Sequence, residues 1–311
     1  MQNLNVVINL NKPEGISSQQ AVTKVKRLFG AKKAGHAGTL DPLATGVLVV
    51  CLNEATKITR FLMDLDKEYA VRLKLGESTD TYDSTGRTIE QKDYQGIRES
   101  DIRGIMSAFQ GRIRQTPPMY SAIKMQGQTL YKLARKGITL DVPEREVTIS
   151  GIDFITFDPP FLDLVISCSK GTYIRSFCND LGNALGVGAH MTALKRTKVG
   201  IFGIEEAVSI EQLTARQTLS LHSIDESISH LKEIILDPES YRKAKNGAPI
   251  DNPFDNIADF VSISNIPTAQ LLDGFKGELN PDYVRLKSPD HVLFGIGKIE
   301  ENRIKIERLL N

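Results

Sequence analysis

The amino-acid sequence predicts an α+β protein. Segments with the twofold alternation of strands and segments with helical periodicity are mixed along the chain without regular βαβ spacing, which favours α+β over a doubly wound α/β fold. The 311 residues are 41% hydrophobic and 25% charged, the balance of a soluble globular chain. Internal repeats and low-complexity segments are not visible. Disordered, collagen-like and coiled-coil classes are therefore excluded.

The first helix has the clearest boundaries. Ser17 is followed three residues later by Gln20, the pattern of a capping box. Val22 and Val25 then fall on one face, and Gly30 ends the segment. By the same reasoning we expect, in chain order, a strand at 5–10, the helix from 17 to 30, a strand at 47–52, a helix at 55–63, a strand at 69–75, a helix from 102 to 111, a helix at 128–136, strands at 147–157 and 162–168, a helix at 173–185 and a strand at 198–204.

The chain changes character after about residue 231. Short β-like segments follow, punctuated by proline and glycine, at 283–286, 292–299 and 304–309. We therefore expect two domains, with residues 1–231 forming the larger one and residues 232–311 a small β domain.

Charge is segregated along the chain although the formal net charge is only +1. Residues 15–40 carry five basic side chains and residues 102–140 carry seven, both without an acid, whereas residues 205–283 carry fourteen acids against six bases. If the basic stretches converge in space, they form a surface for a phosphate backbone. A charge run by itself more often marks a solvated helix face.

The sequence contains no pattern typical of a membrane protein, a disulfide-bonded protein, a metal site or a nucleotide-binding site. The longest apolar run, 47–52, is far shorter than the roughly 18 residues of a membrane span, so a cytoplasmic protein with no membrane partner is expected. Three cysteines without a CxxC pair, and five scattered histidines, predict reduced thiols and no metal. No nucleotide-binding glycine fingerprint is present, so no cofactor is expected.

The small-residue loop 35–46 is the first candidate site. Its glycines permit close backbone approach, and it holds one imidazole, His36, and one carboxylate, Asp41. Because Asp41 precedes Pro42, its backbone is held extended. An ordinary Asx-type turn would explain an isolated Asp-Pro equally well.

Two further stretches contain groups suited to binding anions. Arg175 lies on the predicted first turn of a helix, where its planar guanidinium could hold a carboxylate at two points and keep it ionised. Between residues 115 and 137, the basic residues Lys124 and Arg135 are interleaved with Tyr120 and Tyr131, a combination that suits splayed or single-stranded RNA.

Taken together, these stretches resemble the TruB-type tRNA pseudouridine synthases over nearly all of the first 205 residues. The matching motifs are KPEGISS at 12–18, KAGH at 33–36, DPLATGVL at 41–48, KEY at 67–69, PPMYSAIK at 117–124, KGTYIR at 170–175 and LKRT at 194–197. The C-terminal segment is similar to the PUA domain of many members. The resemblance implies the pseudouridine synthase fold, with a mixed, largely antiparallel sheet flanked by helices.

The resemblance also implies a reaction. Uracil of one T-loop uridine in tRNA is flipped out, detached from C1′, turned and rejoined through C5, without a cofactor. Asp41 corresponds to the essential aspartate, which either attacks C1′ or removes the C2′ proton. Arg175 corresponds to its pairing arginine, and Tyr69 to the tyrosine that stacks on uracil and takes part in removing the C5 proton.

The remaining expected site residues bind RNA by the same resemblance. His36 enters the space that the flipped base leaves, and Leu194 forms a wall of the pocket. A basic insertion near 112–137 clamps the RNA. The residues expected to contact substrate or RNA are His36, Leu194, Tyr173, Lys12, Lys124, Tyr131 and Arg135.

Three alternatives remain open on the sequence alone. A non-catalytic RNA-binding protein would share the basic stretches, and a sugar hydrolase could use Asp41 as a nucleophile, although its usual second carboxylate is absent from the matching motifs. A guide-RNA-dependent relative would share the aspartate loop. The insertion favours the stand-alone bacterial form, which we expect to act as a monomer on the T-arm stem-loop of tRNA without a guide RNA or protein partner.

Overall fold

The computed structural model describes residues 4–125, 127–138, 140–215, 220–252 and 282–310. Its α-helices are α1 (Ser18–Leu28), α2 (Thr59–Met63), α3 (Glu99–Met106), α4 (Leu130–Ala134), α5 (Ile174–Ala184), α6 (Ile210–Ala215), α7 (Ile224–Ser227) and α8 (Pro238–Lys245), and its 3-10 helices are η1 (Asn53–Ile58), η2 (Ser107–Phe109) and η3 (Ile204–Glu206). The strands are β1 (Val7–Lys12), β2 (Ala34–His36), β3 (Thr45–Leu52), β4 (Lys67–Leu75), β5 (Glu77–Thr79), β6 (Thr88–Gln91), β7 (Gly111–Gln115), β8 (Lys124–Met125), β9 (Gln128–Thr129), β10 (Arg145–Asp158), β11 (Phe161–Cys168), β12 (Ala189–Val199), β13 (Phe202–Gly203), β14 (Leu221–His222), β15 (Lys232–Ile235), β16 (Ile250–Asp251), β17 (Tyr283–Lys287), β18 (Leu293–Glu300) and β19 (Arg303–Leu309).

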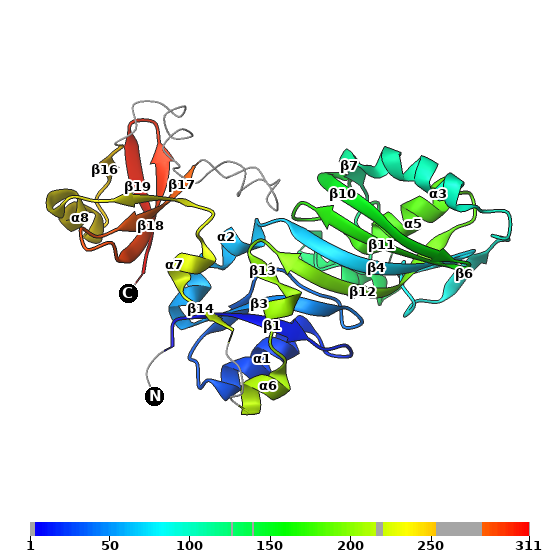
Figure 1. Ribbon diagram of the computed structural model, residues 1–311, viewed down its shortest axis with the longest axis horizontal. Helices are drawn as coiled ribbons and strands as arrows, with labels where there is room; N and C mark the ends of the chain where they lie inside the picture. The colour runs from blue at the N-terminus through cyan, green and yellow to red at the C-terminus, as the bar shows by residue number, and fades with distance from the viewer. Residues whose placement is uncertain (1–3, 126, 139, 216–219, 253–281, 311) are drawn as a thin grey trace.

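A ten-stranded sheet runs through the larger part of the molecule (Figure 1). Its main path has the order β14-β1-β3-β12-β4-β11-β10-β7, with β2 paired to β3 and β13 to β12. Neighbouring strands are antiparallel except β12 and β3, which are parallel. This mixed sheet with helices packed against it confirms the predicted α+β class and the largely antiparallel sheet.

Strand β3 is apolar along its whole length because both of its faces are covered. Leu48 and Val50 pack in one core with residues of α1, α3, α5 and α6. Val47 and Val49 pack in a second core with residues of η1, α2 and the C-terminal sheet. The continuous hydrophobic run is thus typical of a strand buried on both sides.

Helix α1 forms as its N-terminal signal predicts. The Ser17 hydroxyl accepts a hydrogen bond from the Gln20 amide, and the Gln20 side chain accepts one from the Ser17 amide, which confirms the capping box. Ala21, Val22 and Val25 are buried against the sheet.

One predicted strand is wrong. Residues 198–204 do not form a single strand, because the central strand β12 occupies 189–199 and only β13, at 202–203, follows it. Register shifts at Met191/Ala193 and Arg196/Lys198 interrupt the regular alternation of β12. The alternation of apolar and polar residues therefore does not predict the bounds of β12, a strand in the middle of the sheet.

A second sheet of five strands, in the order β15-β17-β18-β19-β16, forms the C-terminal part of the described chain. Strand β15 begins at Lys232, the residue at which a second domain is expected to start. This sheet and α8 enclose a small core of their own. The strands predicted at 283–286, 292–299 and 304–309 are confirmed as β17, β18 and β19, while the functional division of the chain into domains stays a prediction.

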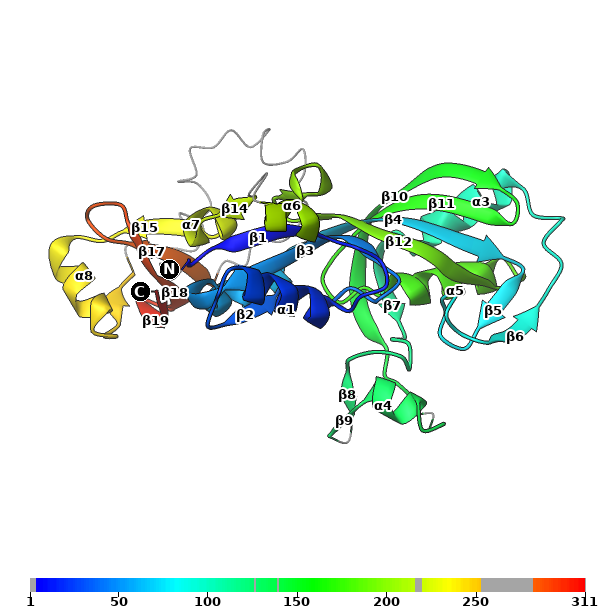
Figure 2. The same ribbon diagram turned by 90° about the horizontal axis from the view of Figure 1, so that it is seen from below.

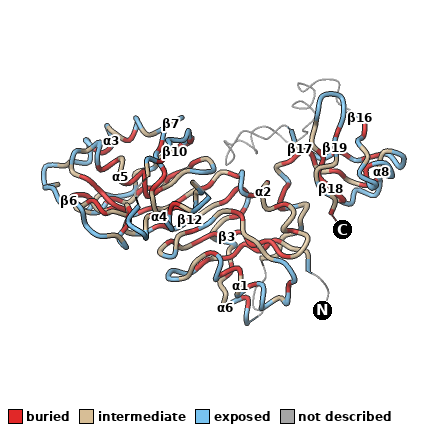
Figure 3. Tube along the Cα trace, turned by 180° about the vertical axis from the view of Figure 1, so that it is seen from behind, coloured by how far each residue is buried: buried red, intermediate tan, exposed pale blue. Residues whose placement is uncertain are grey.

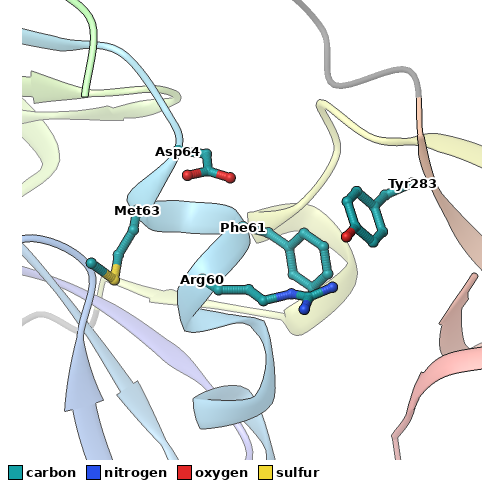
Figure 4. A pocket seen from close by; sticks show the side chains of 5 residues that line it. All are labelled: Arg60, Phe61, Met63, Asp64 and Tyr283. Carbon is teal, nitrogen blue, oxygen red and sulfur yellow. The ribbon is translucent and has the colours of Figure 1, made fainter. Parts of the chain in front are cut away.

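A single hydrophobic core joins the ten-stranded sheet to the C-terminal sheet. Ile296 and Leu310 of the C-terminal part pack in the same core as Phe61 and Leu62. Buried segments accordingly run through the centre of both parts, whereas the surface helices and loop tips are exposed (Figure 3). Where α2 meets β17 there is a notch of about 340 Å³, lined by Arg60, Phe61, Met63, Asp64 and Tyr283 (Figure 4).

No helix in the described ranges has both the length and the apolar character needed to span a membrane.

Gly46 allows strand β12 to approach β3 closely. Its φ is +97°, and a Cβ atom added there would lie 2.2 Å from the carbonyl oxygen of Arg196. Gly46 is paired with Arg196 in the parallel β3–β12 ladder. Any side chain at this position would therefore push the two central strands apart.

We expect Gly46→Ala to lower the free energy of unfolding by about 3 kcal/mol or more, because the substitution combines a backbone clash with an unfavourable φ. Gly186→Ala is the matched control: its φ is +79° and nothing lies within 4 Å of the added Cβ, so it should cost only about 1 to 2 kcal/mol. Urea denaturation of both variants measures the difference, and equal losses would contradict the role assigned to Gly46.

Candidate active site

The loop that carries Asp41 is held in place by backbone and side-chain contacts from distant parts of the chain. The Ser18 hydroxyl, on α1, donates to the carbonyl of Leu40 at 2.9 Å and accepts from its amide at 2.8 Å. The amide of Gly15 donates to the carbonyl of Pro42 at 2.9 Å. These contacts fix the loop on both sides of Asp41, so its carboxylate projects from a defined position.

Asp41 and Arg175 form a two-point ion pair. Arg175 Nε lies 3.0 Å from Oδ2 of Asp41, and Nη2 lies 3.4 Å from Oδ1. The Arg175 side chain is 6% exposed, whereas that of Asp41 is 39% exposed. The carboxylate is therefore bound by the guanidinium on one side and open on the other, where a substrate could reach it.

Three separate segments converge on Arg175. Its remaining N–H groups donate to the carbonyl of Thr81 at 3.1 Å and to the carbonyl of Tyr120 at 2.7 Å. Asp83 approaches from the loop that follows β5, with its Oδ2 atom 3.5 Å from Nη1. One buried guanidinium thus joins the Asp41 loop, the loop after β5 and the segment after β7.

Asp83 is a site residue that the sequence analysis missed. It is 5% exposed, and its Oδ1 accepts from the Thr81 hydroxyl at 2.7 Å, from the Thr85 hydroxyl at 2.6 Å and from the Thr85 amide at 3.0 Å. The preceding residue, Tyr82, has φ +62°, which is uncommon for a residue with a bulky side chain. The sequence at 76–86 is rich in Thr, Asp, Ser and Gly, but nothing in it indicates that one of its acids turns inward.

The pKa of Asp41 is raised above the ordinary aspartate value. Burial is the main cause, and the negative charge of Asp83 acts in the same direction. The positive charge of Arg175, together with its hydrogen bond, lowers the pKa of Asp41 and opposes both effects. Arg175 is therefore the main group that favours the ionised carboxylate, and the positive charge of Lys12 adds a smaller effect in the same direction.

Tyr69 and Leu194 lie next to this pair on adjacent strands. Tyr69 is on β4 and is 9% exposed, and the Asp41 carboxylate is near enough to raise the pKa of its phenol further, although burial is the main cause of that rise. Leu194, on β12, is 8% exposed, and its carbonyl accepts a hydrogen bond from the Thr45 hydroxyl at 3.5 Å. The structure thus gathers Asp41, Tyr69, Arg175 and Leu194 around one end of the loop.

His36 ends strand β2 just before the Asp41 loop. Burial lowers the pKa of its imidazole, and the positive charge of Arg196 lowers it further. Its buried Nδ1 atom has no hydrogen-bond partner among the described residues. A neutral ring at this position suits the filling of a gap better than the pairing of a phosphate.

Lys12 was expected to contact RNA, but the structure places it in the interior. It is 0% exposed, and its ammonium donates to the carbonyls of Pro13 and Ile16 at 2.8 Å each and of Pro42 at 3.4 Å. Burial lowers the pKa of Lys12 to about 8, a shift that the charge of Asp41 opposes. Lys12 therefore holds the backbone around Asp41 through carbonyl groups, and its ammonium does not reach the surface.

The segment between β7 and β10 projects from the body of the protein (Figure 2). It contains β8, β9 and α4 and has a small core of Leu130, Leu133 and Val142. Lys124, Tyr131 and Arg135, the expected RNA contacts, are exposed on it. The guanidinium of Arg135 lies 5.1 Å from the centre of the Tyr131 ring. Lys124, Tyr131 and Arg135 are thus exposed to solvent on a structured projection, with Arg135 and Tyr131 in contact with each other.

Tyr173 is positioned by its backbone. The buried Gln115 side chain accepts from the Tyr173 amide at 2.8 Å and donates to its carbonyl at 3.0 Å. Tyr173 is the N-cap residue of α5, so these two hydrogen bonds also fix the start of the helix that carries Arg175. Gln115 is a second residue whose part in the site the sequence did not indicate.

The described residues contain no group of three or more His, Cys, Asp or Glu side chains arranged to hold a metal ion.

Two family models and many curated relatives match this chain, and all belong to one family. Residues 26–174 match the N-terminal domain of the TruB family pseudouridylate synthases, and residues 175–241 match the tRNA pseudouridylate synthase B C-terminal domain. The tRNA pseudouridine synthase B of Clostridium tetani is 39% identical over 99% of this chain and 100% of its own length, and that of Pasteurella multocida is 45% identical over 79% and 83%.

The fold is also similar to that of solved structures. A crystal structure of a Cbf5-Nop10-Gar1 complex contains a chain with a TM-score of 0.71 and 24% identity, covering 98% of this chain and 84% of that one. At this identity the likeness concerns the fold alone.

We expect opposite changes of the Asp41 pKa in two variants. Arg175→Met removes the positive charge that lowers this pKa, so the pKa should rise; Asp83→Asn removes a negative charge that raises it, so the pKa should fall. Carbon-13 NMR titration of labelled aspartate carboxyls measures both. Shifts in the same direction, or no shift in Arg175→Met, would contradict the arrangement of charges described above.

Proposed function

Because the chain belongs to the TruB family and is a tRNA pseudouridine synthase, an isomerase that converts uridine in tRNA to pseudouridine, we propose that its target is a single uridine in the T loop. The uracil is detached from C1′, turned and rejoined through C5. The observation that supports this most directly is the Asp41–Arg175 pair, a carboxylate that is held at two points and open on one face.

In the proposed reaction Asp41 acts on the ribose. Its carboxylate either attacks C1′ or removes the C2′ proton, and both routes need the ionised form while a base covers it. Arg175 supplies the charge that favours this form. The ring of Tyr69 stacks on the displaced uracil, and Leu194 forms the apolar wall beside it.

A uridine within a folded T loop must leave the base stack before it can reach Asp41. We assign to His36 the filling of the space that the base leaves, since its ring is held neutral. The projection with Lys124, Tyr131 and Arg135 holds the RNA by phosphate contacts and stacking, and Tyr173 faces the bound loop.

We assign catalysis to a domain of residues 1–231, in which an insertion near 112–137 clamps the RNA. Residues 232–311 form a PUA-like β domain in this proposal. We propose that the chain acts alone as a monomer in the cytoplasm, without a guide RNA. Its relatives near 40% identity are named tRNA pseudouridine synthase B, whereas the Cbf5 structure is titled as a complex with Nop10 and Gar1 and shares only the fold.

We expect Asp41→Asn to abolish tritium release from a T-arm stem-loop labelled at C5 of uridine, while its affinity for the RNA stays nearly unchanged. The carboxylate acts on the sugar and contributes little to binding of the phosphates. Wild-type protein is assayed in parallel without added metal or nucleotide. Tight binding without release by the wild type would favour the alternative of a non-catalytic RNA-binding protein, and near-normal release by Asp41→Asn would remove the carboxylate from the mechanism.

Replacing Lys132, Arg135 and Lys136 together with glutamine should weaken RNA binding and flatten its dependence on salt, because each phosphate contact contributes about one unit to the slope of log affinity against log salt. The control replaces three exposed cations of α8, Arg242, Lys243 and Lys245, which changes the net charge equally. Filter binding at several salt concentrations measures both. A slope unchanged in the first variant would place the RNA elsewhere.

A further inference from the structure

Gln115 is a buried polar side chain that bonds the backbone of a distant helix. It is 1% exposed and ends strand β7. Its side-chain oxygen accepts from the Tyr173 amide at 2.8 Å, and its side-chain nitrogen donates to the Tyr173 carbonyl at 3.0 Å. One planar amide thus bonds both backbone groups of Tyr173, in the way that a neighbouring strand would bond them.

A further side-chain bond lies beside these two. The Ser176 hydroxyl donates to the carbonyl of Thr116 at 2.8 Å, and Ser176 is 1% exposed. The start of α5 is therefore attached to residues 115 and 116 by three hydrogen bonds, all made by buried side chains. Because Arg175 lies between Tyr173 and Ser176, these bonds fix its backbone on both sides.

The same segment also bonds the guanidinium of Arg175. The Nη2 atom donates to the carbonyl of Tyr120 at 2.7 Å. Two prolines, Pro117 and Pro118, stand between the two points of attachment; both are buried, and their rings hold φ near about −65°. Segment 115–120 is therefore stiff, and it holds the backbone of Arg175 at one end and the guanidinium at the other.

Segment 115–120 is also the root of the RNA-facing projection. Gln115 is paired with Arg145 in the β7–β10 ladder, so the chain leaves the body of the protein after one member of this pair and returns at the other (Figure 2). Directly after the segment, the carbonyl of Ser121 accepts from the amide of Tyr131, in the first turn of α4, at 3.0 Å. The segment thus lies between the projection and the catalytic ion pair.

We propose that Gln115 is a positioning residue for catalysis: it holds the start of α5 where the Arg175 guanidinium meets both oxygens of Asp41. This inference rests on the proposed function, in which that carboxylate reacts. Nε and Nη2 of Arg175 lie 3.0 and 3.4 Å from the two carboxylate oxygens. A shift of about 1 Å at the start of the helix would break this two-point contact, and misplacement on that scale can cost about 10²-fold in rate.

Displacement of Arg175 changes the balance of charge at Asp41. The groups that face this carboxyl are Arg175 on α5, Asp83 in the loop after β5, Lys12 on β1 and the phenol of Tyr69 on β4. Arg175 has the largest effect among those that lower the pKa of Asp41. With its guanidinium farther away, the pKa of Asp41 rises and less of the carboxyl is ionised at a given pH. The rate loss is then largest at low pH and shrinks as the pH rises.

The test compares Gln115→Met with Asn9→Leu. Methionine is similar in length to glutamine but has no amide, so it cannot form the two bonds to Tyr173. Asn9 is a buried amide on β1 that donates to the carbonyl of Gly203 in β13 at 2.8 Å, so Asn9→Leu is the matched control for the loss of a buried amide. Carbon-13 NMR titration of labelled aspartate carboxyls in the full-length protein should show a raised Asp41 pKa in Gln115→Met and the wild-type pKa in Asn9→Leu.

Single-turnover rates on a T-arm stem-loop are measured over a range of pH. Gln115→Met should be slowed on the order of 10²-fold at low pH and less at high pH, with RNA affinity within about twofold of the wild type, because phosphate contacts supply most of that affinity. The variant that replaces Lys132, Arg135 and Lys136 should do the reverse, with weaker RNA binding and an unchanged Asp41 pKa.

An unchanged Asp41 pKa in folded Gln115→Met, or an equal rise in Asn9→Leu, would overturn the proposal. Thermal unfolding shows whether each variant is folded. If Gln115→Met is not, Gln115→Asn serves instead, because its amide is one methylene too short to reach both groups of Tyr173. It should also raise the Asp41 pKa, and a wild-type value in the folded variant would overturn the proposal. Absence of C5 tritium release by the wild type would contradict the proposed function, whereas the NMR titration tests the placement of Arg175 in either case.

Discussion

The ion pair between Asp41 and Arg175 is the contact on which the geometry of the site depends. Arg175 also bonds the carbonyls of Thr81 and Tyr120, so the same guanidinium sets the positions of three loops. Removing one partner of a buried pair usually costs about 3 to 5 kcal/mol, since the other charge is left unpaired in a dry environment. Arg175 therefore links the orientation of the carboxylate to the positions of the loop after β5 and the segment after β7.

A general feature of the region around Asp41 is that buried cations bond backbone carbonyl groups. Lys12 bonds the carbonyl of Pro42, Arg196 bonds that of Gly38, and Lys67 bonds those of Met63 and Leu65 at the end of α2. These bonds fix the backbone without neutralising the positive charge. Buried positive charge therefore lies close to Asp41, where Arg175 and Lys12 both lower the pKa of its carboxyl group.

The sequence predicts local features better than long-range ones. The Ser17 capping box, the buried strand β3 and the C-terminal strands each have a signal confined to a few neighbouring residues, and the structure confirms them. The bulged strand β12 and the inward turn of Asp83 depend on contacts with distant segments. Lys12 was expected to contact RNA by resemblance alone, and its burial becomes clear only from its three carbonyl partners, which local sequence does not reveal.

The sequence separations within the site have a consequence for synthesis on the ribosome. Asp41 meets Arg175 across 134 positions, and Gly38 meets Arg196 across 158. Chains grow from the N-terminus, so the aspartate loop emerges long before either arginine that orders it. A nascent chain that ends before Arg175 and Arg196 cannot form these two contacts, so the Asp41 loop lacks both partners until β12 has been synthesised.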